Sequence, residues 1–486
     1  MIRRIFASVG ILIALLIIAV VVLPYFVGLR AEQGFEYQVR RFNASHAIFR
    51  LRVDAYHRGF YSSDADVTLR GTTKQSSRFF GALFGTGAKA QFHIRINHGP
   101  IPFAAFGAEH VNFLPVLYTA EFRGRNLPPL SFLGALKPDV YLVQYFGGAT
   151  RAHIAVPSGR FGLGAAGARW DGGEATIRVD SAHDRSEYRG TIAPIEFQYM
   201  DTSLGVTYDT QVQPIEFSGT RSKAKHDLWV GTGSASFAGL SVSSEDGELV
   251  RLAGAKTSSA IRESADGRWI GGHVRLDQDG GVIRGWRFSR FSVEGSVLRL
   301  DAAALDRGLR ALRQQSTRVA KQLTASRARV VAGNALAPAI TTATRAEVAA
   351  TLAAASGSAK FAAHLGFTRA SATSVGIPGA SLRRLAVGEG SLDFDRKLAN
   401  DFATKVLGPA FAMLIEQSLQ GLVRQGYLTV NAAGACHALL GYRAGVLTVN
   451  GRSVSGVTQA PAARTAQRAG GGRLRAMRGA EGSPIP

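Results

Sequence analysis

The chain opens on a long uncharged stretch. Ile5–Leu29 is rich in Ile, Leu and Val and follows the basic pair Arg3-Arg4. About 20 apolar residues in a helix cross the hydrocarbon core of a bilayer, so this stretch is long enough even if Pro24 ends the helix early. Because basic residues tend to stay in the cytoplasm, the pattern predicts a single-pass anchor with the rest of the chain on the far side of the membrane.

A cleaved signal peptide is the alternative. Such a peptide carries an apolar region of about 7–15 residues that ends in a small-x-small cleavage site. The apolar stretch here is longer, and Leu23–Val27 offers no such site. The sequence therefore favours an anchor that is retained.

Between residues 44 and 300, apolar and polar residues alternate in short runs. Phe49, Leu51 and Val53 share one face of an extended segment, and Gln91–Ile96 and Glu174–Val179 repeat the pattern. A period of two with β-branched and aromatic residues indicates half-exposed strands. No long helical period interrupts the region, which argues against a parallel α/β sheet. Turn signals that fit antiparallel connections occur at Asp171-Gly172-Gly173, Asp246-Gly247 and Asp279-Gly280-Gly281.

The pattern changes over Asp301–Leu365. Apolar residues recur at three-, four- and seven-residue steps, with Arg and Lys between them, at Leu305, Leu309, Leu312, Val319 and Leu323. This spacing predicts an amphipathic helix, and Thr341–Leu352 is interpreted as a second one. Such helices either pack as a layer on a sheet or lie on an anionic membrane surface.

The C-terminal part mixes both kinds of element. Phe367–Phe394 is strand-like, and Lys397–Gly426 predicts one or two helices with a kink at Pro409 and a stop at Gly426. The Asn450-Gly451 pair is a turn signal. Short strands are expected at Tyr427–Val430, His437–Tyr442 and Val446–Val449. The remaining Gly, Ala, Arg and Pro residues show no periodicity and are predicted to be disordered.

These patterns predict an α+β fold: one N-terminal transmembrane helix, then an extended antiparallel β-rich domain with a helical layer. The expected segments are the cytoplasmic tip with the anchor, a β-rich region, a basic amphipathic helical segment, a C-terminal strand–helix–hairpin region and an Arg-rich tail. Their bounds are residues 1–29, 30–300, 301–365, 366–455 and 456–486.

The formal net charge of +22 favours anionic partners such as acidic lipid, lipopolysaccharide, glycan or nucleic acid. Part of it is local: Asp301–Ala350 carries eight Arg and Lys against three acids, and Gly456–Pro486 five Arg against one Glu. The predicted topology removes nucleic acid from the expected partners. Cys436 is the only cysteine, which excludes an intramolecular disulfide and a cysteine-based metal site.

Three segments resemble the YdgA-like bacterial proteins (domain of unknown function 945). Tyr56-His57-Arg58-Gly59-Phe60-Tyr61-Ser62-Ser63-Asp64-Ala65 is similar to their Y-x-R-G-aromatic-aromatic-S-S-x-A stretch. Asn97-His98-Gly99-Pro100-Ile101-Pro102 is similar to the H-G-P-hydrophobic-P element that follows. The segments from Gly421 to Leu428 and from Gly445 to Gly451 are similar to the terminal Q-G-Y-L and L-T-V-N-G elements. Phe60-Tyr61 replaces the frequent Trp-Phe, and the tail after Ser455 lies beyond the pattern.

The resemblance implies an inner-membrane-tethered periplasmic protein rich in antiparallel sheet. The family has no established function, so no catalytic residue carries over. The motif residues that we single out as structural candidates are Tyr56, Arg58, Gly59, Phe60, Ser62, Ser63, His98, Gly99, Pro100, Gly426, Tyr427, Asn450 and Gly451. Gly59 permits a turn or bulge, after which Phe60 and Tyr61 are expected on opposite faces of a strand. His98 is the best candidate for chemistry.

Catalytic patterns are mostly absent. The chain contains neither H-E-x-x-H nor G-x-S-x-G, and Gly231-Thr232-Gly233-Ser234 lacks the Lys and the helix of a phosphate loop. Asp393 and Asp395 would share a strand face, and helix capping or pairing with neighbouring basic residues explains them. Cys436 and His437 are adjacent strand residues, which point apart. We therefore expect no catalytic residue, no metal site and no cofactor.

The preferred function is a non-enzymatic envelope protein, a scaffold or a lipid-interacting protein, whose apolar sheet face forms a groove for acyl chains or another protein. One alternative is a binding protein for anionic lipid or lipopolysaccharide that uses the basic helix and tail. Another is an unrecognised hydrolase with a site near His98. The expected partners are the membrane, lipid or an anionic envelope polymer, and a second copy of the chain.

Overall fold

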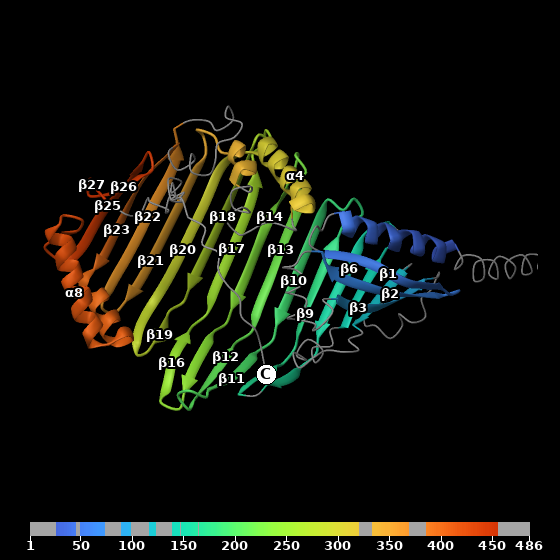
Figure 1. Ribbon diagram of the computed structural model, residues 1–486, viewed down its shortest axis with the longest axis horizontal. Helices are drawn as coiled ribbons and strands as arrows, with labels where there is room; N and C mark the ends of the chain where they lie inside the picture. The colour runs from blue at the N-terminus through green and yellow to red at the C-terminus, as the bar shows by residue number, and fades with distance from the viewer. Residues whose placement is uncertain are drawn as a thin grey trace, which may run out of the picture.

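One broad antiparallel sheet dominates the computed structural model (Figure 1). The structure describes residues 26–44, 49–72, 89–98, 116–122, 139–145, 147–163, 165–319, 333–368 and 385–454. Within these ranges, 27 strands belong to a single hydrogen-bonded sheet. This sheet crosses the boundaries drawn at residues 300 and 365, so the sequence-based segments are not separate sheets.

The strands follow one another with short connections for most of the chain. The first six are β1 (Phe49–Arg58), β2 (Ser62–Gly71), β3 (Lys89–His98), β4 (Val116–Phe122), β5 (Asp139–Gln144) and β6 (Thr150–Val156). The next are β7 (Gly159–Leu163), β8 (Ala166–Trp170), β9 (Gly173–Val179), β10 (Arg185–Ile192), β11 (Ile195–Asp201), β12 (Val206–Val212), β13 (Ile215–Lys223), β14 (Trp229–Phe237), β15 (Leu240–Ser244), β16 (Gly247–Leu252), β17 (Ala255–Glu263), β18 (Trp269–Gln278), β19 (Gly281–Ile283) and β20 (Trp286–Asp301). The last are β21 (Arg345–Ala354), β22 (Gly357–Phe367), β23 (Ala386–Asp395), β24 (Thr429–Val430), β25 (Ala435–Arg443), β26 (Val446–Val449) and β27 (Arg452–Ser453).

The strands pair in two ladders that meet at β20. The main ladder runs β1-β2-β3-β4-β5-β6-β9-β10-β13-β14-β17-β18-β20-β21-β22-β23-β25-β26-β27, with β24 also on β25. The second ladder runs β7-β8-β11-β12-β15-β16-β19-β20. From β6 to β19 the two ladders are two halves of the same long strands, because β6 continues into β7, β8 into β9, β10 into β11, and so on to β18 and β19.

A crease separates the two ladders, and proline or glycine marks it in each strand. Pro157, Pro194 and Pro214 lack the N–H that a strand residue donates, while Gly172 and Gly280 adopt positive φ. Backbone hydrogen bonds continue across the crease, for example from Asp171 N to Pro194 O at 3.0 Å and from Asp279 N to Gly254 O at 2.8 Å. The sheet therefore bends without dividing.

The crease corrects two expected turns. Asp171-Gly172 and Asp279-Gly280 lie inside long strands: β8 pairs with β7 and β11 rather than with β9, and β19 pairs with β16 and β20 rather than with β18. Asp246-Gly247, in contrast, lies at the β15–β16 hairpin as predicted. The same Asp-Gly signal thus serves a hairpin or a bend, and pairing with more distant strands decides which.

A helix over residues 26–44, called here the N-terminal helix, covers one face of β1–β3 at the blue end of the sheet in Figure 1. Its Ala31 and Phe35 form a buried cluster with Ala65, Val67 and Ile96. Ala31 and Phe35 are four residues apart and therefore lie on one side of the helix. The strand residues that meet them alternate along their strands and therefore share one face of the sheet. This cluster fixes the helix to the sheet.

Helix α4 (Ala302–Val319) follows β20 directly, as the sequence predicted. Asp301 caps it by accepting a hydrogen bond from Ala304 N at 2.8 Å, and Leu305 and Leu309 pack against a cluster that includes Ile270. The apolar side of its first half therefore rests on the sheet, which favours the packed-layer interpretation over a helix lying on a membrane.

The second helix expected in this region, Thr341–Leu352, is wrong. The 3₁₀ turn η2 (Ala337–Ala339) precedes strand β21, which pairs with β20 and β22 along its whole length. Alanine favours helix locally, but Ala346, Val348 and Ala350 alternate along one face of the strand. Pairing on both sides outweighs the local preference.

The C-terminal helices are confirmed. α7 (Arg396–Phe402), the π-helical turn η4 (Ala403–Leu407) and α8 (Pro409–Arg424) follow β23. Pro409 occupies the first turn of α8, and Gly426 has a positive φ of 72° just beyond its end. The strand predicted at Val446–Val449 is β26. The helices lie at one end of the sheet, beside β23 and β25 (Figure 1).

The anchor predicted at Ile5–Leu29 lies outside the described residues up to position 25, as does the tail from position 455 onward. No helix that the structure describes combines the length and apolar character needed to cross a bilayer. Val27 packs against the buried cluster of the N-terminal helix, and a Cβ on Gly28 would meet the His98 ring. These two residues therefore belong to the packed domain, and the anchor stays a prediction for the residues before them.

Candidate functional site

The register of the main ladder sorts its side chains onto two unlike faces. Paired residues of antiparallel strands lie on the same side of a sheet, so the pairing identifies each face without ambiguity. One side, named here the apolar face, carries Ile94, Val140, Leu142, Ala152, Ile154, Ile177, Val179, Tyr188, Phe217, Trp229, Ala235, Ile261, Val274, Leu276, Phe291, Val293, Val297, Val348, Leu352, Phe361, Leu365, Leu392, Phe394 and Leu440.

The opposite side is the polar face. It carries Arg151, His153, Glu174, Thr176, Arg178, Arg189, Glu216, Ser218, Thr232, Ser234, Ser236, Lys256, Ser258, His273, Arg275, Asp277, Ser292, Glu294, Glu347, Thr351, Lys360, His364, Asp393 and His437. Cross-strand contacts such as Ser218 Oγ to Ser234 Oγ at 3.0 Å link neighbouring strands. Arg275 donates to Asp277 at 2.6 Å and holds the pKa of that carboxyl below its usual value.

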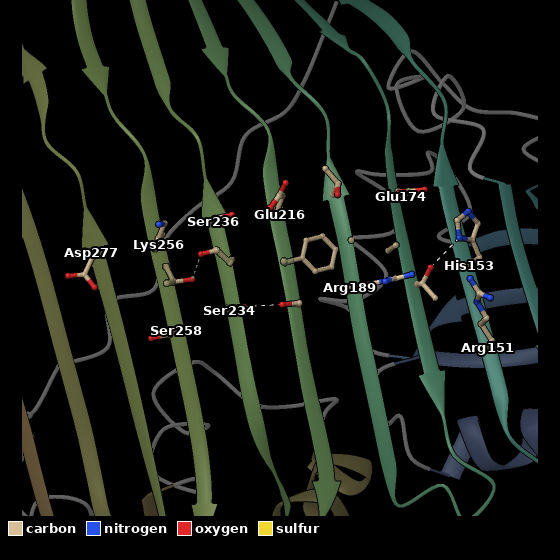
Figure 2. Close-up of a pocket in the computed structure, with 18 residues that line it drawn as sticks. Arg151, His153, Glu174, Arg189, Glu216, Ser234, Ser236, Lys256, Ser258 and Asp277 are labelled. Atoms are coloured by element: carbon tan, nitrogen blue, oxygen red, sulfur yellow. Dashed lines mark hydrogen bonds between the residues drawn. The ribbon is translucent and has the colours of Figure 1, made fainter.

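A cavity of about 740 Å³ lies on the polar face, and Figure 2 shows its lining side chains on neighbouring strands. Arg151, Arg189 and Lys256 line it together with Glu174 and Glu216. Basic and acidic side chains alternate across the cavity, so its lining has no dominant charge that would attract an ionic ligand. It fits a hydrated surface better than a specific pocket.

The apolar face remains open to solvent in its middle. Val274 is 55% exposed and Ile261 47%, and Val297 and Val348 are exposed as well. Apolar residues this exposed on neighbouring strands are unusual on a soluble surface and mark sites that bind lipid, membrane or protein. The sheet therefore has an exposed apolar face, on which the groove hypothesis from the sequence rests.

Glycines on the apolar face make room for aromatic rings. A Cβ on Gly219 would lie 2.4 Å from the Tyr188 hydroxyl, and one on Gly233 2.8 Å from it, so this ring lies flat across β13 and β14. Gly231-Thr232-Gly233-Ser234 therefore belongs to strand β14 and has no loop in which to hold a phosphate. The two glycines keep the apolar face smooth.

A second cavity opens on the apolar face where the N-terminal helix ends its coverage. Its volume is about 530 Å³. Most of its wall is apolar, and its lining includes Phe35, Ile94, Val140, Leu142, Ala152, Ile177, Val179 and Trp229. It is named here the helix-side cavity, and it is continuous with the rows of apolar residues on β9–β14.

Basic groups stand at this cavity. Arg41 of the N-terminal helix, His183 and Arg221 contribute to its lining, and none of its lining residues is Asp or Glu. Arg221 Nε donates to Ser186 Oγ at 2.7 Å, and its guanidinium lies 4.9 Å from the centre of the Trp229 ring. Sequence reasoning missed these residues because each is an isolated basic residue in a different segment.

His98 and Ser63 meet beneath the N-terminal helix. Ser63 Oγ and His98 Nε2 are 3.0 Å apart, and the two residues are 0% and 1% exposed. A Cβ on Gly28 would lie only 2.7 Å from His98 Cε1, so glycine allows the helix to rest on the imidazole ring. His98 N also donates to Tyr61 O at 2.8 Å.

Further motif residues bind the same helix. Arg58 forms an ion pair with Glu32 at 3.3 Å, and the rings of Tyr56 and Phe35 lie 5.9 Å apart. Burial raises the pKa of Tyr56 above its usual value. The motif around Tyr56–Ser63 and His98 therefore holds the N-terminal helix in place, and it is named here the helix clasp. Gly99 and Pro100 lie outside the described residues.

The start of β2 differs from expectation. Gly59 N donates to Ser62 O at 2.8 Å in the turn between β1 and β2, and β2 begins only at Ser62. Phe60 and Tyr61 therefore belong to the turn, where their rings meet edge to face at 4.8 Å. The expectation that they point to opposite faces of a strand is wrong, because the turn is longer by two residues.

The burial of His98 bears on the hydrolase hypothesis. A catalytic serine must reach a substrate carbonyl, whereas Ser63 Oγ is enclosed between β2, β3 and the N-terminal helix. Neither Ser63 nor His98 lines any of the cavities described above. Among the described residues, access to Ser63 Oγ would need the helix to move away, and the hydrolase stays a prediction.

The C-terminal motif builds a second structural cluster. Asn450 and Gly451 form the two-residue turn between β26 and β27, both with positive φ. Asn450 Nδ2 donates to Tyr427 O at 3.1 Å, and its Oδ1 accepts from Leu439 N at 2.8 Å. A Cβ on Gly426 would lie 2.7 Å from Arg452 Nε. These residues close the end of the sheet.

The acidic pair has structural partners. Asp393 bonds with His437 Nδ1 at 2.6 Å, and Asp395 accepts from Ser358 N at 2.6 Å. Asp395 precedes α7 but makes no side-chain capping bond, so the capping interpretation is wrong. Cys436 is buried on the side opposite His437, and burial raises the pKa of its thiol. Within the described ranges, no group of three metal-binding side chains occurs.

No curated protein and no solved structure shows significant similarity to this chain. The family described as "Bacterial protein of unknown function (DUF945)" matches residues 6–456, which include the helix clasp, the whole sheet and the C-terminal cluster. The chain therefore belongs to the DUF945 family of bacterial proteins.

Proposed function

We propose that the protein is a non-enzymatic lipid-binding protein of the bacterial envelope that holds acyl chains along its apolar face. The observation that carries the proposal is the exposed row of apolar side chains on consecutive strands, with Val274 and Ile261 at its centre. A sheet with one apolar and one polar face needs a partner for the apolar side. Acyl chains supply one without requiring a shape-specific pocket.

The energetics suit an exchange of lipid with a membrane. Each methylene removed from water contributes about 0.8 kcal/mol, so an acyl chain on the apolar face is stable against release into solvent. A chain that moves from a bilayer to this face passes from one apolar environment to another, and the two states therefore differ little in free energy. The protein would hold lipid without trapping it.

The proposed location follows from the N-terminus. An inner-membrane anchor before residue 26 would place the N-terminal helix, the helix clasp and the helix-side cavity at the membrane end of a periplasmic sheet. The basic residues Arg3 and Arg4 and the uncharged stretch after them support this orientation. The helix clasp then has a clear role, since it fixes the sheet to the segment that leaves the membrane.

Native mass spectrometry of the full-length protein, extracted in a mild non-ionic detergent, tests the proposed function. We expect adducts with the masses of phospholipids, which organic extraction and lipid analysis identify. Lipid that remains bound after detergent exchange supports the proposal. A protein that carries no lipid, and that takes up none from added phospholipid, contradicts it.

A further inference from the structure

The helix-side cavity differs from the rest of the apolar face in its charge. Along most of the apolar face the side chains are uncharged, but Arg41 and Arg221 line this cavity. No Asp or Glu is among its lining residues, and no carboxylate of the described residues forms an ion pair with Arg221. A place with apolar walls and basic side chains in its lining suits an amphiphile with an anionic group.

Lys223 shows the contrast on the same strand. It lies two residues from Arg221 and thus on the same face of β13, but Asp227 at 2.9 Å and Asp184 at 3.8 Å neutralise it. Hydrogen bonding to Asp227 raises the pKa of Lys223. Asp184 and Asp227 pair with Lys223, whereas Arg221 donates to Ser186 and lies over Trp229.

The geometry of Arg221 is fixed in advance. Its Nε donates to Ser186 Oγ, and its guanidinium carbon lies over the Trp229 ring. The terminal nitrogens of the guanidinium can still donate hydrogen bonds. Because the guanidinium is planar, two of its N–H groups can bond two oxygens of one phosphate at once.

We infer that the helix-side cavity binds the anionic phosphate headgroup of a phospholipid, whose acyl chains run from it along the apolar face. The inference rests on the proposed function, since it gives the bound lipid an orientation. The headgroup lies beside the N-terminal helix, at Arg221 and Arg41, and the chains extend over β9–β14 toward Val274. The volume of about 530 Å³ holds a headgroup with the first part of the chains, within the range of about 300–1,000 Å³ typical of ligand sites.

Competition between two lipids with the same chains tests the inference. The full-length protein in mild detergent is incubated with equal amounts of dioleoylphosphatidylglycerol and dioleoylglycerol, and native mass spectrometry gives the ratio of the two adducts. A charge-assisted hydrogen bond contributes about 1.5–3 kcal/mol, so we expect the phospholipid to be favoured at least about tenfold. Arg221→Gln should reduce this ratio about tenfold, and Arg41→Gln should also lower it.

Arg178→Gln is the matched control, because Arg178 lies on the polar face of neighbouring β9 and faces away from the cavity. It should leave the ratio unchanged. Arg221→Lys, which keeps the charge but loses the paired donors, should give an intermediate ratio and also shows that the fold tolerates a change at this position. An equal fall in the Arg178→Gln protein would overturn the inference.

The outcomes separate the inference from the proposed function. If the protein binds both lipids equally well, the headgroup site is wrong while acyl-chain binding stands. If it binds neither lipid, the proposed function itself fails. Two results together support the headgroup site and the binding of acyl chains. The preference for phospholipid depends on Arg221, and the Arg221→Gln protein still binds dioleoylglycerol.

Discussion

Replacing Val274 and Ile261 together by glutamate is expected to abolish the retention of lipid by the full-length protein. Both side chains lie on the apolar face, on the neighbouring strands β18 and β17. A carboxylate placed against an acyl chain loses its hydration without gaining a partner, which is strongly unfavourable. We expect bound phospholipid, measured by native mass spectrometry, to fall at least about tenfold.

The fold should tolerate this change. Val274 is 55% exposed and Ile261 47%, and substitutions at exposed positions usually alter stability by only about 0.5 kcal/mol. Ser258→Glu adds the same charge to the polar face of β17, and it should leave lipid retention unchanged. Retention of lipid at the wild-type level in the double variant would show that the apolar face is not where lipid binds.

A second large effect is expected in the helix clasp. Gly28→Ala places a Cβ 2.7 Å from His98 Cε1, and the ring cannot retreat because it is buried and bonded to Ser63. Overpacking of this kind costs about 1–3 kcal/mol. The N-terminal helix should open more often, so hydrogen exchange measured by mass spectrometry should quicken in residues 31–44 and in β1–β3.

Gly34→Ala provides the control in the same helix. Among the described residues, no atom outside the neighbouring part of its own helix lies within 4 Å of the position its Cβ would take, and alanine is favoured over glycine in a helix by about 1 kcal/mol. Exchange in the N-terminal helix should therefore slow. The two identical substitutions are expected to act in opposite directions. If Gly28→Ala also slows exchange, the contact between the helix and His98 is not a constraint on the fold.

Much of the fold could be predicted from residue patterns. Alternation at Phe49–Val53 and Glu174–Val179 correctly indicated strands, because one side of the sheet is apolar and the other hydrated. The helices around Pro409 were predicted because proline and glycine fix their ends. Thr341–Leu352 was misjudged, since alanine is small enough for either element and only pairing with β20 and β22 decides. The crease at Gly172 and Gly280 was likewise hidden, because a bend and a hairpin use the same residues.

The candidate site was predicted only in outline. An apolar face followed from the alternation, but its continuity depends on the register of strands that are far apart in sequence. On β13, Arg221 occupies a position that faces the apolar side of the sheet. Analysing the alternation of each strand separately could have identified this basic residue as an exception. The significance of Arg41 could not be predicted, because only the packing of the N-terminal helix brings it to β13. His98 was singled out from the sequence, and its contacts with Ser63 and its position beside Gly28 place it beneath the N-terminal helix.

Photo-crosslinking in intact cells tests the binding of acyl chains to the apolar face most directly. A diazirine-bearing residue is placed at Val274 on the apolar face or, as the control, at His273 on the polar face of the same strand. After irradiation, the purified protein is analysed by mass spectrometry for attached lipid. We predict lipid adducts at position 274 and none at position 273. Equal labelling at both positions, or attachment at 274 of protein alone, would contradict lipid binding along the apolar face.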